Sequence, residues 1–138
     1  MILRYISAFC SLLLTAGFIS AANACPIVDD GTVTRLTSDQ YDVAMKTIPE
    51  TVTVGELFAV DLEICRKDGT PFTGTVKAAA NMPAHKHGMN YQPEIASRDR
   101  DTFHLQGFAF HMQGQWQYAF ELRENGGTEL LLLDHDLK

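Results

Sequence analysis

Short stretches of alternating apolar and polar residues constrain the fold of this chain more than any other feature. In LFAVDLEIC, one face of an extended chain would carry Phe58, Val60, Leu62 and Ile64, with acidic residues on the other face. This two-residue period is typical of a strand with one buried face. Turn-forming stretches such as RKDGTP and ENGG separate the alternating ones, and the sequence shows no sustained helical period.

Other stretches with strand character follow one another along the chain. They read YDVAMKTI, TVTVGE, FTGTVKAAANM, QPEIAS, TFHLQGFAF, GQWQYAFELR and TELLLLDHD. Roughly seven short strands in a chain of this length predict an all-β protein, an immunoglobulin-like antiparallel β-sandwich over residues 41–138. We expect Trp116 in its core, because an indole buries well between two sheets. Residues 25–40 read as a polar leader.

The N-terminus has the form of a secretory signal peptide over residues 1–24. Arg4 precedes an apolar run that ends near Ile19, and the small residues of Ala22-Asn23-Ala24 follow. The run is shorter than the roughly 20 residues that a membrane-spanning helix needs. We therefore expect a periplasmic or secreted protein that is not transmembrane after cleavage.

Three cysteines occur in the chain, and Cys10 would leave with the signal peptide. The remaining pair, Cys25 and Cys65, favours a disulfide in an oxidising compartment. Closing a loop of about 40 residues would stabilise the fold by roughly 4 kcal/mol in the chain-entropy interpretation. The alternative is a lipoprotein, anchored to a membrane through an acylated Cys25, because that residue would directly follow the cleavage site.

Charge and motif content exclude several classes of function. Cleavage would remove Arg4 and no acidic residue, which leaves 10 basic against 17 acidic residues and a net charge of −7. An acidic surface argues against binding to nucleic acid or anionic lipid. The sequence contains no G-x-S-x-G, H-E-x-x-H, P-loop or dinucleotide-binding motif, so we do not expect an enzyme.

The stretch NMPAHKHGMNYQP has the most distinctive chemistry in the chain. It holds Met82, His85, His87 and Met89, and imidazole suits copper and zinc while thioether ligands favour Cu(I). In an extended chain His85 and His87 would point the same way, with Cα atoms about 6.6 Å apart. Met89 would continue on that side, whereas the direction of Met82 stays open because Pro83 interrupts the strand.

A second group, in FHLQGFAFHM, lies where the end of a strand could approach this loop. Strand alternation places Phe110 and Met112 on the core side and His111 outside. We expect one copper ion bound by His85, His87 and Met89, with Met82 and either His111 or Met112 completing the shell. Zinc is less favoured, because neither a cysteine pair nor a carboxylate lies in the motif.

The remaining histidines have simpler interpretations. His104 alternates with Phe103 and Leu105 and is expected on the solvent face of a strand. His135, near the C-terminus, is expected at the surface and not as a ligand. The loop itself also has a metal-free interpretation, as a solvated tip around Lys86.

The loop and the strand after it resemble the small exported domains called YtkA-like, which are related in shape to the FixH proteins. The matching residues are Met82, Pro83, His85, His87, Gly88, Pro93, Phe110, Met112, Gly114 and Trp116. The resemblance covers about half of the chain after the signal peptide and implies an immunoglobulin-like fold and export. Several such relatives are linked with copper handling or cytochrome oxidase maturation.

Two functions from different classes are therefore expected. The first is an exported copper-binding domain whose partners are the copper ion and a copper-handling or oxidase assembly protein. The second is a metal-free periplasmic interaction module, in which Met89, Tyr91 and Pro93 contact a partner protein.

Overall fold

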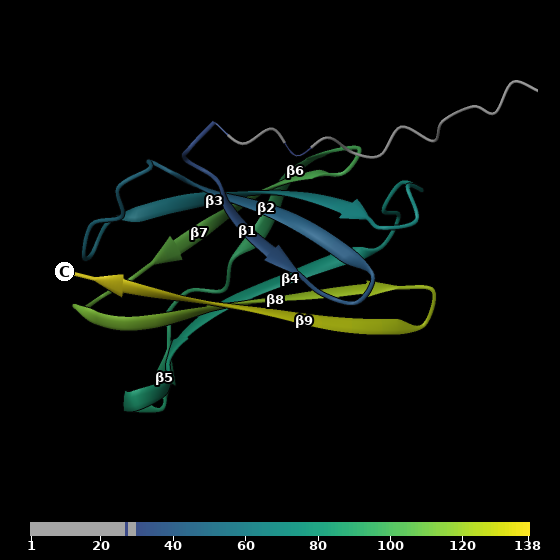
Figure 1. Cartoon of the computed structure of the whole chain (residues 1–138). Helices are drawn as coiled ribbons and strands as arrows, with labels where there is room; N and C mark the ends of the chain where they lie inside the picture. The colour runs from purple at the N-terminus through teal and green to yellow at the C-terminus, as the bar shows by residue number, and fades with distance from the viewer. Residues whose placement is uncertain (1–26, 28–29) are drawn as a thin grey trace, which may run out of the picture.

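The computed structural model describes residue 27 and residues 30–138. The predicted signal peptide and Cys25 lie outside these residues. The described chain forms nine strands and one 3₁₀ turn (Figure 1). In chain order they are β1 (Thr34–Thr37), β2 (Tyr41–Ile48), β3 (Leu57–Arg66), β4 (Thr75–Met82), η1 (Pro83–His85), β5 (His87–Gly88), β6 (Glu94–Asp99), β7 (Thr102–Ala109), β8 (Gly114–Glu124) and β9 (Gly127–Leu137).

The strands form two antiparallel sheets that pack face to face. One sheet has the order β1-β2-β3-β7-β6, and the other has the order β5-β4-β8-β9. The prediction of an all-β sandwich is confirmed. The strand count exceeds the expected seven, because β1 lies within the predicted polar leader and β5 has only two residues. Among the described residues, none belongs to a helix long and apolar enough to span a membrane.

Alternation along each central strand builds the core between the sheets. On β4, every second residue from Val76 to Met82 is buried, and on β8 the buried positions run from Trp116 to Leu122. Aromatic residues fill much of the space between the layers, and Phe110 stacks on Trp116 with ring centroids 4.4 Å apart. Trp116 is fully buried, as an indole between two sheets was expected to be.

The stretch TVTVGE was predicted as a strand and forms a connection instead. Gly55 adopts a positive φ of 80°, which turns the chain before a strand can form. Val52 is nevertheless buried in the core. The backbone N–H of Gly55 donates to the carbonyl oxygen of Phe110 at 2.7 Å, so the connection ties down the segment that follows β7.

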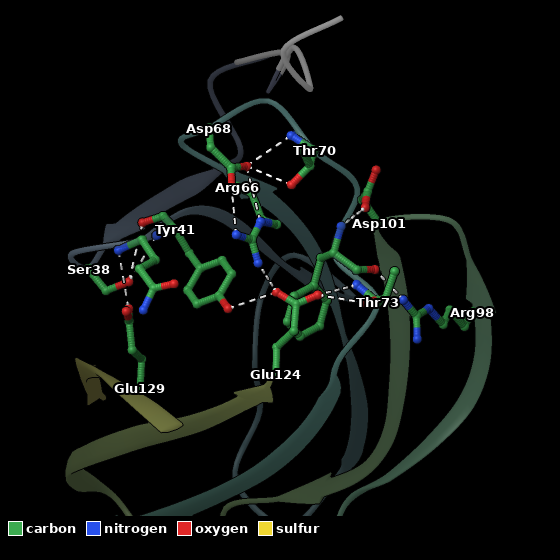
Figure 2. A network of polar contacts seen from close by, with 12 residues as sticks. Ser38, Tyr41, Arg66, Asp68, Thr70, Thr73, Arg98, Asp101, Glu124 and Glu129 are labelled. Carbon is green, nitrogen blue, oxygen red and sulfur yellow. Dashed lines mark hydrogen bonds and ion pairs between the residues drawn. The ribbon is translucent and has the colours of Figure 1, made fainter. Parts of the chain in front are cut away.

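A polar cluster closes the end of the sandwich at which β8 finishes (Figure 2). The carboxylate of Glu124 accepts bonds from Arg66, from the Tyr41 hydroxyl at 3.0 Å, and from the backbone N–H and hydroxyl of Thr73 at 2.6 and 2.8 Å. Burial alone would raise the pKa of Glu124, but these hydrogen bonds outweigh burial and lower it. We call Glu124 with these three partners the Glu124 clamp.

Cys65 lies near the end of β3 and is buried. Its predicted disulfide partner, Cys25, is outside the described residues. The disulfide and the alternative of an acylated Cys25 therefore both stay predictions.

Candidate metal centre

The histidine loop is a compact turn that folds back onto β4. Pro83 opens η1, a position that suits its fixed φ. Lys86 then adopts a left-handed conformation with φ of 55°, and its N–H donates to the carbonyl oxygen of Met82 at 3.0 Å. The next two residues form β5, in which His87 pairs with Met82. The loop is thus not the extended segment that would align His85 with His87.

His87 instead meets His111, which follows β7 in the opposite sheet. Their Nε2 atoms lie 3.1 Å apart, and the ring centroids lie 5.1 Å apart. One ring donates its Nε2–H and the other accepts through the Nε2 lone pair. His111 is exposed and His87 is partly exposed. The pair bridges the two sheets at the end of the sandwich opposite the Glu124 clamp.

Trp116 forms the floor beneath this pair. Its indole lies edge to face with the His111 ring, at 5.2 Å between centroids, and with the His87 ring at 6.2 Å. The indole Nε1–H donates to the carbonyl oxygen of Met112 at 3.0 Å. Together with the Gly55–Phe110 bond, this contact holds the backbone on both sides of His111.

The three methionines of the predicted shell lie at different depths. Met82 is 1% exposed and belongs to the core, whereas Met89 and Met112 are partly buried and pack against it. Met82 also packs closely on Gly114, where an added Cβ would lie 2.8 Å from the Met82 Cε atom. Met89 and Met112 are therefore better placed than Met82 to turn a thioether outward. Strand alternation correctly placed His111 outside, whereas Met112 was expected in the core and is only partly buried.

The other three histidines lie outside the contact between His87 and His111. His85 is exposed in η1, and its ring centroid lies 5.7 Å from that of His87. His104 Nδ1 contacts the Asp61 carboxylate at 2.6 Å on the outer face of the five-stranded sheet. His135 was expected at the surface but is half-buried, with its ring 5.9 Å from those of Phe110 and Tyr118.

Burial sets the protonation of His135. Desolvation lowers its pKa, and the neighbouring Asp136 carboxylate opposes that shift only in part. The ring is consequently held neutral beside the aromatic core.

Across residue 27 and residues 30–138, no group of three or more His, Cys, Asp or Glu side chains is arranged to hold a metal ion. The arrangement at this end of the sandwich is a pair of imidazoles with two thioethers nearby. Such a set can hold a soft ion at low coordination number, with one side left open to an external ligand.

Comparisons with known proteins identify the fold and leave the family open. No protein-family model matches the chain, and no curated protein matches it. A solved structure, a DUF4426 family protein from Pseudomonas aeruginosa PAO1, is similar with a TM-score of 0.56 and 11% sequence identity. The likeness covers 78% of this chain and 96% of that one. At this identity the likeness establishes a shared small β-sandwich fold, and the YtkA-like resemblance stays a prediction.

The expected approach of the His111 segment to this loop is confirmed by the contact with His87, whereas the expected alignment of His85 with His87 on one extended segment is wrong. Two signals pointed to the correct pair. Pro83 followed by Gly88 indicated a turn, and the outward direction of His111 followed from the buried positions of Phe110 and Met112.

Proposed function

We propose that the protein is an exported, non-enzymatic copper-binding domain, and that His87 and His111 provide the principal ligands. The observation that carries this proposal is the 3.1 Å separation of their Nε2 atoms. With metal–nitrogen bonds of about 2.0–2.1 Å, two nitrogens at this spacing subtend roughly 100° at the ion. An ion bound by both nitrogens would replace the shared proton, and each ring would turn so that its Nε2 lone pair faces the ion.

The neighbouring thioethers favour copper over zinc. Met89 and Met112 are partly buried against the core, and they lie two residues after His87 and directly after His111 in the sequence. Thioethers are soft donors that add affinity for Cu(I) and little for Zn²⁺. The exposure of His111 leaves the ion open to ligand exchange with a copper-handling or oxidase assembly protein.

Competition titration tests the proposal. The protein purified after export is titrated with Cu(I) against a chromophoric chelator, and separately with Cu(II) and Zn²⁺. Trp116 fluorescence provides a second readout, because the indole contacts both rings. We expect one Cu(I) per chain, bound more tightly than Zn²⁺, and binding that weakens in acid because protonated imidazoles cannot ligate.

Matched variants locate the site. His87→Ala and His111→Ala should each weaken Cu(I) binding by at least about tenfold, which is about 1.4 kcal/mol. His104→Ala is the control, since that ring contacts Asp61 on another face. Met112→Leu should reduce Cu(I) affinity more than Cu(II) affinity. Unchanged copper binding in the double variant of His87 and His111 would contradict the proposal.

A second candidate function is a metal-free interaction module, and one surface favours it. Ile48, Leu57 and Tyr91 are 42%, 68% and 60% exposed and line one shallow depression on the five-stranded sheet. Exposed apolar side chains gathered in this way are typical of a protein contact. Loss of binding to a partner protein in Leu57→Glu, with copper binding intact, would support this function.

A further inference from the structure

The outward face of the four-stranded sheet carries two exposed leucines on its edge strand, β9. Leu130 and Leu132 on β9 are 59% and 50% exposed. Strand register places Leu132 in one row with Ala119 on β8 and Ala79 on β4. The next row contains Leu130, Glu121 and Lys77, and the row on the other side contains Asp134, Gln117 and Asn81. We call these nine residues the outer face.

The outer face is complementary to itself in shape. In its central row the side chain on β9, Leu132, is large, whereas those on β8 and β4, Ala119 and Ala79, are small. A two-fold axis parallel to the strands and passing over Ala119 would set Leu132 of each copy against Ala79 of the other. The same axis would set Leu130 on the aliphatic stem of Lys77. Near the axis the two Glu121 carboxylates approach each other, and each is already paired with Arg123 at 2.6 Å.

Charge at one end of the sheet fits the same arrangement. Asp134 and Asp136 are exposed near the end of β9, and Lys86 is exposed in the loop beyond the corresponding end of β4. Figure 1 shows β5, the edge strand of the four-stranded sheet, projecting below β8 and β9 on the side away from the five-stranded sheet. A depression between this loop and the sheet is lined by Asn81, Lys86 and Gln117. The two-fold axis would bring Lys86 of each copy toward the acidic corner of the other.

We propose that two copies of this chain associate through the outer face as a symmetric dimer. The proposal is independent of copper binding. The outer face with one further row at each end spans about 27 by 15 Å along β4, β8 and β9, or roughly 400 Å². This is about half of the roughly 800 Å² per partner found in stable specific complexes, so the two loops must add to the contact and we expect a weak, transient dimer. The dimer should therefore dissociate in the micromolar range.

Sedimentation equilibrium in a chelator, on the protein purified after export, measures the association. The parent protein should be mainly dimeric at about 200 µM. Leu132→Glu places a charge in the centre of the contact and should raise the dissociation constant by at least about 100-fold, since a buried unpaired charge is costly. Leu57→Glu, also an exposed leucine but on the other sheet, should leave it unchanged.

A charge exchange tests the orientation of the two copies. Lys86→Glu should weaken the dimer, and combining it with Asp134→Lys should restore much of the loss, because the pair would again have opposite signs across the contact. A parent protein that is monomeric at about 200 µM, or a dimer that Leu132→Glu leaves intact, would overturn the proposal. A dimer disrupted by Leu57→Glu would place the contact on the other sheet and overturn it equally.

Discussion

Arg66 near the end of β3 and Glu124 at the end of β8 form an ion pair that ties the five-stranded sheet to the four-stranded one. The Glu124 side chain is only 3% exposed, and all of its bonds come from charged or polar groups of the clamp. Removing the charge from one partner of such a buried pair leaves the other uncompensated.

Glu124→Gln should therefore lower the free energy of unfolding by about 2 kcal/mol at neutral pH. The folded state lowers the pKa of Glu124 below its ordinary 4.5, so this stabilisation is complete above that value and is lost as the pH falls through the folded pKa. Urea unfolding at pH about 7 and about 3 should show a smaller acid-induced loss in the variant. Asp68→Asn, which alters the exposed partner of Arg66, is the control and should have a lesser effect at neutral pH.

His135 should make the fold sensitive to mild acid. Burial lowers the pKa of His135 in the folded protein. The stability that the neutral ring contributes is therefore complete above its ordinary pKa of 6.5. This stability declines as the pH falls below that value, because the unfolded chain takes up the proton first. His135→Gln should flatten the stability profile between pH about 7.5 and 5.5. Asp136→Asn should steepen it, because that carboxylate partly supports the charged ring. Identical profiles in all three proteins would contradict this assignment.

Gly114→Ala should destabilise the protein by two separable effects. The positive φ of 125° disfavours any side chain, and the new Cβ would meet Met82 Cε at 2.8 Å. Gly126→Ala is a matched control, since Gly126 has φ of 80° and no atom within 4 Å of an added Cβ. We expect backbone strain in Gly126→Ala to lower the free energy of unfolding by about 1–2 kcal/mol, and Gly114→Ala to lower it by more. Thermal or urea unfolding measures both.

The two predictions for Cys25 can be separated by mass. A disulfide to Cys65 should raise the intact mass by two hydrogens when the purified protein is reduced, and reduction should lower its stability by roughly 4 kcal/mol. A mass increased by acyl chains would establish the lipoprotein instead. A Cys65→Ser variant should lose the reductant-dependent change in the first case only.

The β-sandwich fold was predictable because a strand that buries one face has alternating apolar and polar residues, and this alternation is visible in the sequence. Leu57 to Cys65 and Trp116 to Phe120 follow it, and the structure places their alternate residues in the core. The stretch TVTVGE has the same period but forms no strand, since Gly55 turns the chain with a positive φ.

The candidate site was predictable in its residue types and in the approach of the His111 segment to the loop, but not in which histidines meet. His85, His87 and Met89 are close in sequence, but the turn at Pro83 and the left-handed Lys86 separate the directions of the two histidines. The contact between His87 and His111 depends on how two sheets meet at their ends. That geometry is a property of the packed sandwich, and a local period cannot encode it.

The two ends of the sandwich are closed by different kinds of hydrogen bond. At one end the Glu124 clamp operates whenever its carboxylate is ionised, whereas at the other a single imidazole-to-imidazole bond joins β5 to the segment after β7. Amide hydrogens near His87 and His111 should consequently exchange with solvent faster than those around Arg66. Copper held by both rings would add a link between β5 and the segment after β7, so copper binding should slow the exchange of these amide hydrogens.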